Sequence, residues 1–106
     1  MDASQDKPRF RSFAEFYPYY LDEHRNRTTR RLHFVGTSIG TILLVLAVLN
    51  LDAWYLLAGL LVGYAFAWVG HFFFEKNKPA TFQYPVWSFM GDYVMYKDIW
   101  TGKIPF

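Results

Sequence analysis

The sequence predicts an all-α integral membrane protein: a hairpin of two transmembrane helices, with one amphipathic interfacial helix before it and another after it. Three observations support this fold class. Two long apolar runs follow one another closely, aromatic residues recur at helical spacing before the first run, and prolines interrupt the chain after the second. We therefore expect a single membrane domain that comprises residues 1–106.

The two apolar runs are each long enough to cross a bilayer. Residues 34–51 form a run of 18 without a charge, and residues 53–74 form a run of 22. A helix of ~20 apolar residues crosses the hydrocarbon core. We place the transmembrane helices at residues 30–50 and 53–75. A soluble chain of this length could not bury two helices that are apolar on every side.

Each flank of the hairpin is predicted to form a shorter helix. Residues 10–26 carry aromatic side chains at intervals of three and four, which form a stripe that suits a helix lying among lipid head groups. Pro79 and Pro85 interrupt the chain after the second span, and residues 86–100 form the last helix. Its large apolar side chains can face lipid or the hairpin: Trp87, Met90, Val94 and Trp100.

The charges predict the orientation of the hairpin. Residues 50–52 leave space only for a tight turn, so the two spans are antiparallel. All eleven Lys and Arg residues lie on the side that holds both chain ends, whereas the turn carries only Asp52. By the positive-inside rule, both termini are cytoplasmic. Because the basic residues adjoin long apolar runs, we expect the lipid bilayer as a partner and no nucleic acid.

Polar groups and small residues converge at the cytoplasmic end of this hairpin. His33 lies 19 residues before Asp52 and His71 lies 19 residues after it, so we expect their imidazoles at equal height. His24 precedes the first span on the same side, and a four-residue step places Glu75 on the helix face of His71.

Glycines at four-residue spacing occur in both spans. Gly36 and Gly40 lie in the first, and Gly59 and Gly63 in the second. Small residues at this spacing let membrane helices approach closely, so the two stripes are expected to face each other. The same stripes are compatible with a homodimer in place of the intramolecular contact.

These groups indicate a metal site. Imidazole and carboxylate ligands without sulfur suit Fe(II), Mn or Zn, and the chain has no cysteine. Two or three histidines with one carboxylate leave positions open, as non-haem iron oxygenases need for dioxygen and a substrate. Two alternatives stay open: His33 and His71 hold a haem for electron transfer, or the polar residues only stabilise a non-catalytic structural protein.

A longer pattern connects these residues. A histidine is followed two residues later by an asparagine and then by a second histidine, and W-x-x-G-H-x-x-x-E-x-x-x-P-A comes later. The residues that carry the pattern are His24, Asn26, His33, Trp68, Gly70, His71, Glu75, Pro79 and Ala80. In this pattern the chain resembles a family of small membrane proteins typified by the fungal endoplasmic-reticulum 2-hydroxy-fatty-acid dioxygenase, in its compact bacterial form.

The resemblance implies an Fe(II)-dependent dioxygenase that shortens a long-chain 2-hydroxy fatty acid by one carbon and resides in a bacterial inner membrane. His24, His33 and His71 would be the catalytic metal ligands, together with Glu75. Asn26 and Asp92 would support the ligands through hydrogen bonds, with Asp92 as an alternative ligand in place of Glu75. Four arginines would attract the substrate's carboxylate: Arg25, Arg27, Arg30 and Arg31.

Overall fold

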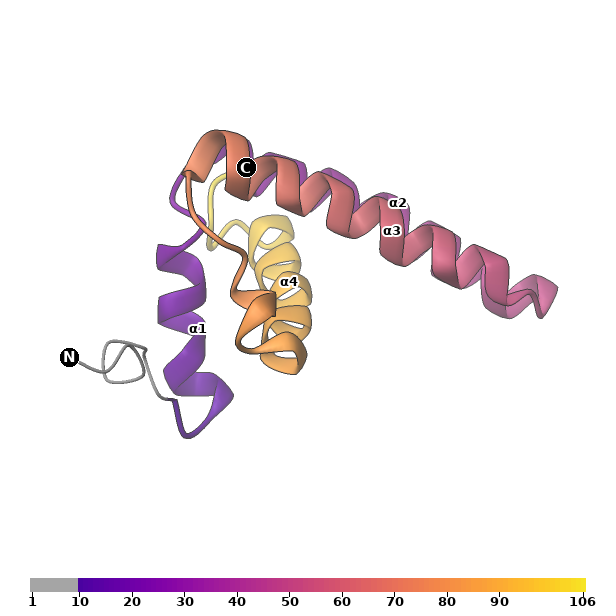
Figure 1. Ribbon diagram of the computed structural model, residues 1–106, viewed down its shortest axis with the longest axis horizontal. Helices are drawn as coiled ribbons and strands as arrows, with labels where there is room; N and C mark the ends of the chain where they lie inside the picture. Colours follow the sequence, from indigo (N-terminus) through magenta and orange to yellow (C-terminus); the bar gives the residue numbers. More distant parts are fainter. Residues whose placement is uncertain (1–9) are drawn as a thin grey trace.

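The computed structural model describes residues 10–106, and within that range the chain is all-helical, which confirms the predicted fold class. The elements in chain order are α1 (Phe13–Asp22), α2 (Arg27–Asn50), α3 (Ala53–Val69), the π-helical segment η2 (Gly70–Glu75), the short 3₁₀ segment η3 (Ala80–Phe82) and α4 (Pro85–Trp100). In Figure 1, α2 and α3 lie side by side as a long hairpin, and α1 and α4 lie alongside each other at the end opposite its turn.

Local caps define the hairpin. Asn26 is the N-cap of α2, and its side-chain oxygen accepts hydrogen bonds from two backbone N–H groups in the first turn. The helix ends at Asn50, and its C-cap Leu51 adopts the left-handed conformation with φ 49°. Asp52 then caps α3 by accepting a hydrogen bond from the N–H of Trp54. The predicted tight turn at residues 50–52 is therefore confirmed.

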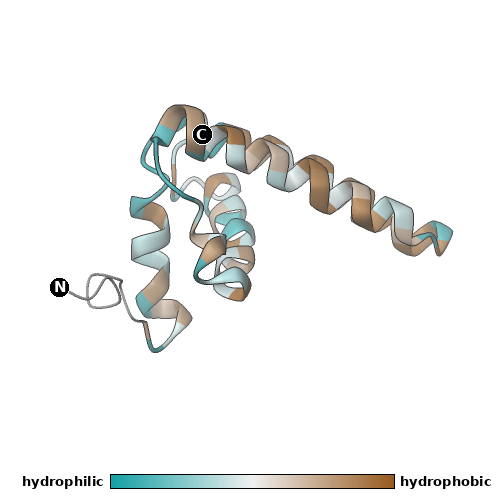
Figure 2. Cartoon of the chain, in the orientation of Figure 1, coloured by the Kyte–Doolittle hydropathy of each residue, from teal (hydrophilic) through white to brown (hydrophobic). Residues whose placement is uncertain are grey.

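The outer surface of the hairpin is apolar and exposed. Both α2 and the combined helix of α3 and η2 are long and apolar enough to cross a membrane, yet only 11% and 22% of their most apolar stretches are buried inside the protein. Near the turn, Leu51 is 92% exposed and Trp54 is 75% exposed, and Figure 2 shows hydrophobic residues along most of the hairpin. Monomeric soluble proteins rarely expose so large an apolar surface.

The glycine stripes of α2 and α3 face each other, as predicted. A Cβ atom at Gly59 would lie 2.9 Å from the carbonyl oxygen of Gly40, so the two helices touch through their backbones at this level. Nearer the base of the hairpin, which is the end opposite its turn, a Cβ atom at Gly63 would lie 3.8 Å from the carbonyl oxygen of Gly36. The stripes thus form the intramolecular contact of the hairpin.

This register corrects the predicted equal height of two histidines. Because Gly70 packs against Thr29, His71 lies about five residues farther from the turn than His33, a step of about 7 Å at the helical rise of 1.5 Å per residue. Side chains in a helix tilt toward the N-terminus of their own helix. In antiparallel helices His33 and His71 therefore lean toward each other, and their ring centroids are 5.1 Å apart.

Outside the hairpin, α1 and α4 form the small hydrophobic core. Phe16 and Tyr20 of α1 are fully buried and pack with Met95 of α4. Gly91 makes this contact possible, because a Cβ atom there would lie 2.9 Å from the Tyr20 ring. The aromatic stripe predicted at residues 10–26 therefore packs largely against protein rather than lipid, and the helix is shorter than predicted.

Candidate metal centre

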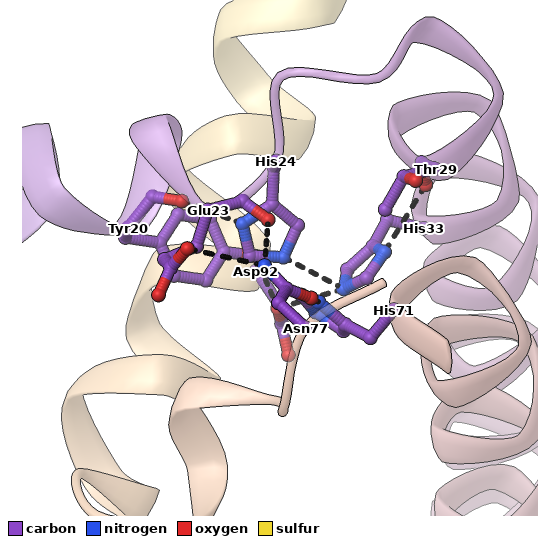
Figure 3. A network of polar contacts seen from close by, with 8 residues as sticks. All are labelled: Tyr20, Glu23, His24, Thr29, His33, His71, Asn77 and Asp92. Atoms are coloured by element: carbon purple, nitrogen blue, oxygen red, sulfur yellow. Dashed lines mark hydrogen bonds and ion pairs between the residues drawn. The ribbon is translucent and has the colours of Figure 1, made fainter. Parts of the chain in front are cut away.

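Three buried histidines meet where the α1–α2 loop, α2 and η2 come together. His24 lies in the loop, His33 in the second turn of α2 and His71 in η2. One ligand nitrogen from each ring lies within 4.8 Å of the other two. Figure 3 shows the three rings converging, with Asp92 of α4 beside them. The structure thus brings together all three histidines singled out in the sequence.

The π-helical turn decides where Glu75 points. In a π-helix the backbone hydrogen bonds join residues i and i+5, so one turn takes more residues than a turn of an α-helix. A four-residue step therefore does not return Glu75 to the helix face of His71. The carboxylate of Glu75 accepts a hydrogen bond from the backbone N–H of Asn26, and Glu75 lies outside the group of three ligand nitrogens. Its contact joins the end of η2 to the loop that carries His24. Asn26, in turn, supports this loop through its backbone and α2 through its side chain.

The Nδ1 atoms of two rings face backbone carbonyl groups. His24 Nδ1 is 2.6 Å from the carbonyl oxygen of Tyr20, and His33 Nδ1 is 3.2 Å from that of Thr29. A carbonyl oxygen only accepts hydrogen bonds, so each Nδ1 must carry the hydrogen. The Nε2 atoms of His24 and His33 therefore present lone pairs.

Asn77 fixes the third ring in the same way. Its side-chain nitrogen donates to the backbone carbonyl and to the carboxylate of Glu23, both at 3.1 Å. Those two acceptors orient the amide so that its oxygen lies 2.8 Å from His71 Nδ1. His71 Nδ1–H donates to this oxygen, and Nε2 of His71 is left with a lone pair as well.

The resulting donor set fits a metal ion. His24 Nε2 and His33 Nε2 are 3.1 Å apart, and neither has a hydrogen to share with the other. Two buried lone pairs at this distance repel, and a cation between them removes the repulsion. Burial and, secondly, the charges of the other two histidines lower the pKa of His24 well below 6.5. Neutral imidazole is the form that binds Fe(II), Mn or Zn.

A small cavity, the histidine chamber, lies between the three rings and α4, and its volume is about 10 Å³. This is close to the smallest volume that holds one water molecule. Asp92 Oδ1 is 3.8 Å from His33 Nε2 and accepts a hydrogen bond from the Tyr20 hydroxyl. Burial raises the pKa of Asp92 to about 7, and the Tyr20 hydrogen bond opposes part of this rise. Asp92 is thus the carboxyl group beside the ligand nitrogens.

Ser88 also lines the histidine chamber, one helical turn before Asp92 on α4. The residue is 2% exposed, and its hydroxyl oxygen has no hydrogen-bond partner among the described residues. A buried hydroxyl without a partner costs free energy, so it is available to a ligand. Sequence reasoning did not assign Ser88, Tyr20 or Asn77 to the site. For two of these residues the sequence did contain a signal, which was their spacing from other site residues. Ser88 precedes Asp92 by four residues, and Tyr20 precedes His24 by four.

Three of the four predicted substrate-binding arginines have partners elsewhere. Arg25 forms an ion pair with Asp22 on the exposed end of α1. Arg27 donates a hydrogen bond to the carbonyl oxygen of Phe106 at 2.6 Å, and the guanidinium of Arg31 lies 5.0 Å from the centre of the Phe106 ring. These contacts hold the C-terminal segment against the first turns of α2.

Arg30 differs from the other three arginines. Its charge lies near enough to His24 to lower the pKa of that ring, although less than burial and the other histidines do. The Nε atom of Arg30 is buried and has no hydrogen-bond partner among the described residues. Among the four arginines predicted to bind the substrate, Arg30 is therefore the one whose positive charge remains available to an anionic group near the histidines.

A family model described as "2-hydroxy-palmitic acid dioxygenase Mpo1-like" matches residues 10–104, which cover nearly the whole chain. No curated protein and no solved structure gives a match.

Proposed function

Because the chain belongs to the Mpo1-like family, described as 2-hydroxy-palmitic acid dioxygenases, we propose that it is an Fe(II)-dependent dioxygenase that acts on long-chain 2-hydroxy fatty acids. The observation that carries the proposal is the convergence of ring nitrogens from three buried histidines, with the Nε2 atoms of His24 and His33 only 3.1 Å apart, beside the carboxyl group of Asp92. The substrate and dioxygen yield an acid shorter by one carbon, carbon dioxide and water. Dioxygen accepts all the electrons that the substrate loses, so no further reductant is consumed.

His24, His33 and His71 are the proposed iron ligands. Bound Fe(II) supplies the redox chemistry that makes dioxygen reactive. Asp92 is the proposed carboxyl group of the site, because Tyr20 holds it beside His33. Glu75 has a positioning role, since it holds the loop that carries His24.

The polar end of the substrate also has candidate partners. The unpartnered Ser88 hydroxyl in the histidine chamber can hydrogen-bond the 2-hydroxyl group. Arg30 supplies a positive charge for the carboxylate on the His24 side of the site. The alternative of a haem between His33 and His71 has little support, because ring centroids 5.1 Å apart leave no space for a macrocycle.

The reaction itself tests this function. Iron-loaded protein under oxygen should convert 2-hydroxypalmitic acid to an acid shorter by one carbon, as measured by mass spectrometry. Palmitic acid should react slower by a factor of about 10⁴, because a site built to hydrogen-bond a hydroxyl leaves its polar groups unpaired when the hydroxyl is missing. Zinc-loaded protein is the matched control and should be inactive, since zinc has no redox chemistry. Iron-loaded protein that leaves the 2-hydroxy acid intact would favour the structural alternative.

We further propose that the hairpin spans a bacterial inner membrane with both termini in the cytoplasm. Lys7 and Arg9 lie outside the described residues, and the other nine Lys and Arg residues lie outside the central apolar length of the hairpin. The turn carries only Asp52, so the positive-inside rule favours this orientation. A cysteine introduced by Asp52→Cys should react with an impermeant thiol reagent only from the periplasmic side. Labelling only from the cytoplasmic side would reverse the orientation.

A further inference from the structure

A second cavity, the hairpin groove, lies along α2 and α3 and has a volume of about 140 Å³. Four residues line both this groove and the histidine chamber: His33, Tyr64, Ala67 and Asp92. The two cavities therefore adjoin, and the groove leads directly to the candidate metal ligands.

The groove is mostly apolar, although Thr37, Tyr64 and Tyr93 also line it, and its histidine and carboxyl group lie at one end. Glycines from both helices line it, and because they have no side chains the helix surface is hollowed there. Leu44 of α2 and Leu56 of α3 lie at the end nearest the turn, and Phe89 of α4 also lines the groove. His33 and Asp92 form the opposite, polar end. A ligand that fits this surface has a long apolar body and one small polar end.

The length of the groove agrees with one lipid chain. Leu44 lies 11 residues after His33 in α2, which corresponds to about 16 Å at 1.5 Å per residue. Half the hydrocarbon core of a bilayer, the depth that one acyl chain reaches, is about 15 Å. The polar end offers few hydrogen-bonding groups, which suits a carboxylate with a hydroxyl better than a glycerophosphate head group.

We propose that the hairpin groove binds the acyl chain of the fatty-acid substrate, and that Leu44 and Leu56 set the longest chain accepted. The nature of the head group rests on the proposed function, whereas the groove rests on its own geometry. In a bilayer the acyl chain leaves one apolar environment for another, so little hydrophobic free energy is gained on entry. Chain length is therefore selected by the steric limit that Leu44 and Leu56 set at the end of the groove nearest the turn.

Substitutions at Leu56 test the steric limit in both directions. Leu56→Trp should shorten the groove and shift the preference among competing 2-hydroxy acids at least tenfold toward shorter chains. Leu56→Ala should lengthen it and shift the preference toward longer chains. Leu57→Trp is the matched control, because Leu57 is 45% exposed, against 42% for Leu56, and does not line the groove. Unchanged preference in both Leu56 variants would overturn the assignment.

A binding readout separates the groove from the reaction. 2-Hydroxypalmitic acid with a diazirine at its terminal carbon should cross-link near Leu44 and Leu56 on irradiation, and Leu56→Trp should remove this cross-link. Cross-linking at these positions without turnover would support the groove and contradict the proposed function. Turnover with cross-links spread over the whole hairpin would contradict the groove and leave the function intact.

Discussion

Replacing any one of His24, His33 and His71 with alanine should abolish the thermal stabilisation that added Fe(II) or Zn(II) gives the purified protein. A metal ion at 100 times its dissociation constant stabilises the folded state by about 2.7 kcal/mol. With one ring missing, the remaining two nitrogens bind too weakly to reach that saturation. Melting curves in mild detergent with and without metal, together with the metal content of each variant, measure the effect.

The matched control for the histidine variants is Glu75→Gln. Glutamine keeps an oxygen that accepts the hydrogen bond from the backbone N–H of Asn26, so the loop with His24 stays in place. We expect this variant to retain the metal-dependent shift in melting temperature. Full iron occupancy in His33→Ala would show that the three rings do not act as one site. Loss of metal in Glu75→Gln would make Glu75 a ligand after all.

The second large effect is expected for Gly59→Ile, which should force α2 and α3 apart. The new Cβ would lie 2.9 Å from the carbonyl oxygen of Gly40, a backbone atom that cannot rotate away. Overpacking of this kind typically costs about 1–3 kcal/mol, and a β-branched side chain at a backbone contact should reach the upper part of that range. Unfolding in mixed detergent micelles measures the loss. Metal affinity should fall with it, because His33 and His71 lie on the two separated helices.

Gly63→Ala is the matched control on the same stripe. A Cβ atom there meets only the carbonyl oxygen of Gly36 at 3.8 Å, which is an ordinary van der Waals contact. We expect its stability to change by less than about 1 kcal/mol, as for substitutions that create no clash. If Gly59→Ile were as stable as Gly63→Ala, the close backbone contact at Gly59 and Gly40 would be wrong.

Much of the hairpin could be predicted because its determinants are local. The apolar runs and the cap at Asp52 lie within the segments that they define, so the turn was found at residues 50–52. The aromatic stripe was harder to interpret. Phe16 and Tyr20 have the spacing of a buried helix face whether the neighbour is lipid or another helix. Only the packing of α4 shows that the neighbour is protein.

The histidines of the candidate site could be predicted from the sequence, whereas its carboxyl group was left open between Glu75 and Asp92. A hairpin brings His33 and His71 to one end whatever the details of its register. The choice of Glu75 assumed regular α-helical geometry, and the π-helical turn of η2 removes that basis. Asp92 reaches the histidines from α4, and no periodicity in the sequence shows how a separate helix packs. Asn77 was missed because it acts from a loop, through one specific hydrogen bond to His71.

The placement of the three histidines on separate segments has a topological consequence. An ion held by all three would close two loops, because His24 and His33 are nine positions apart in the sequence and His33 and His71 are 38 positions apart. By the chain-entropy relation used for disulfides, closing loops of such lengths restricts the unfolded chain by about 3–4 kcal/mol each. The chain has no cysteine and therefore no disulfide, so a bound ion would supply cross-links that the chain otherwise lacks. A chelator would open both loops at once.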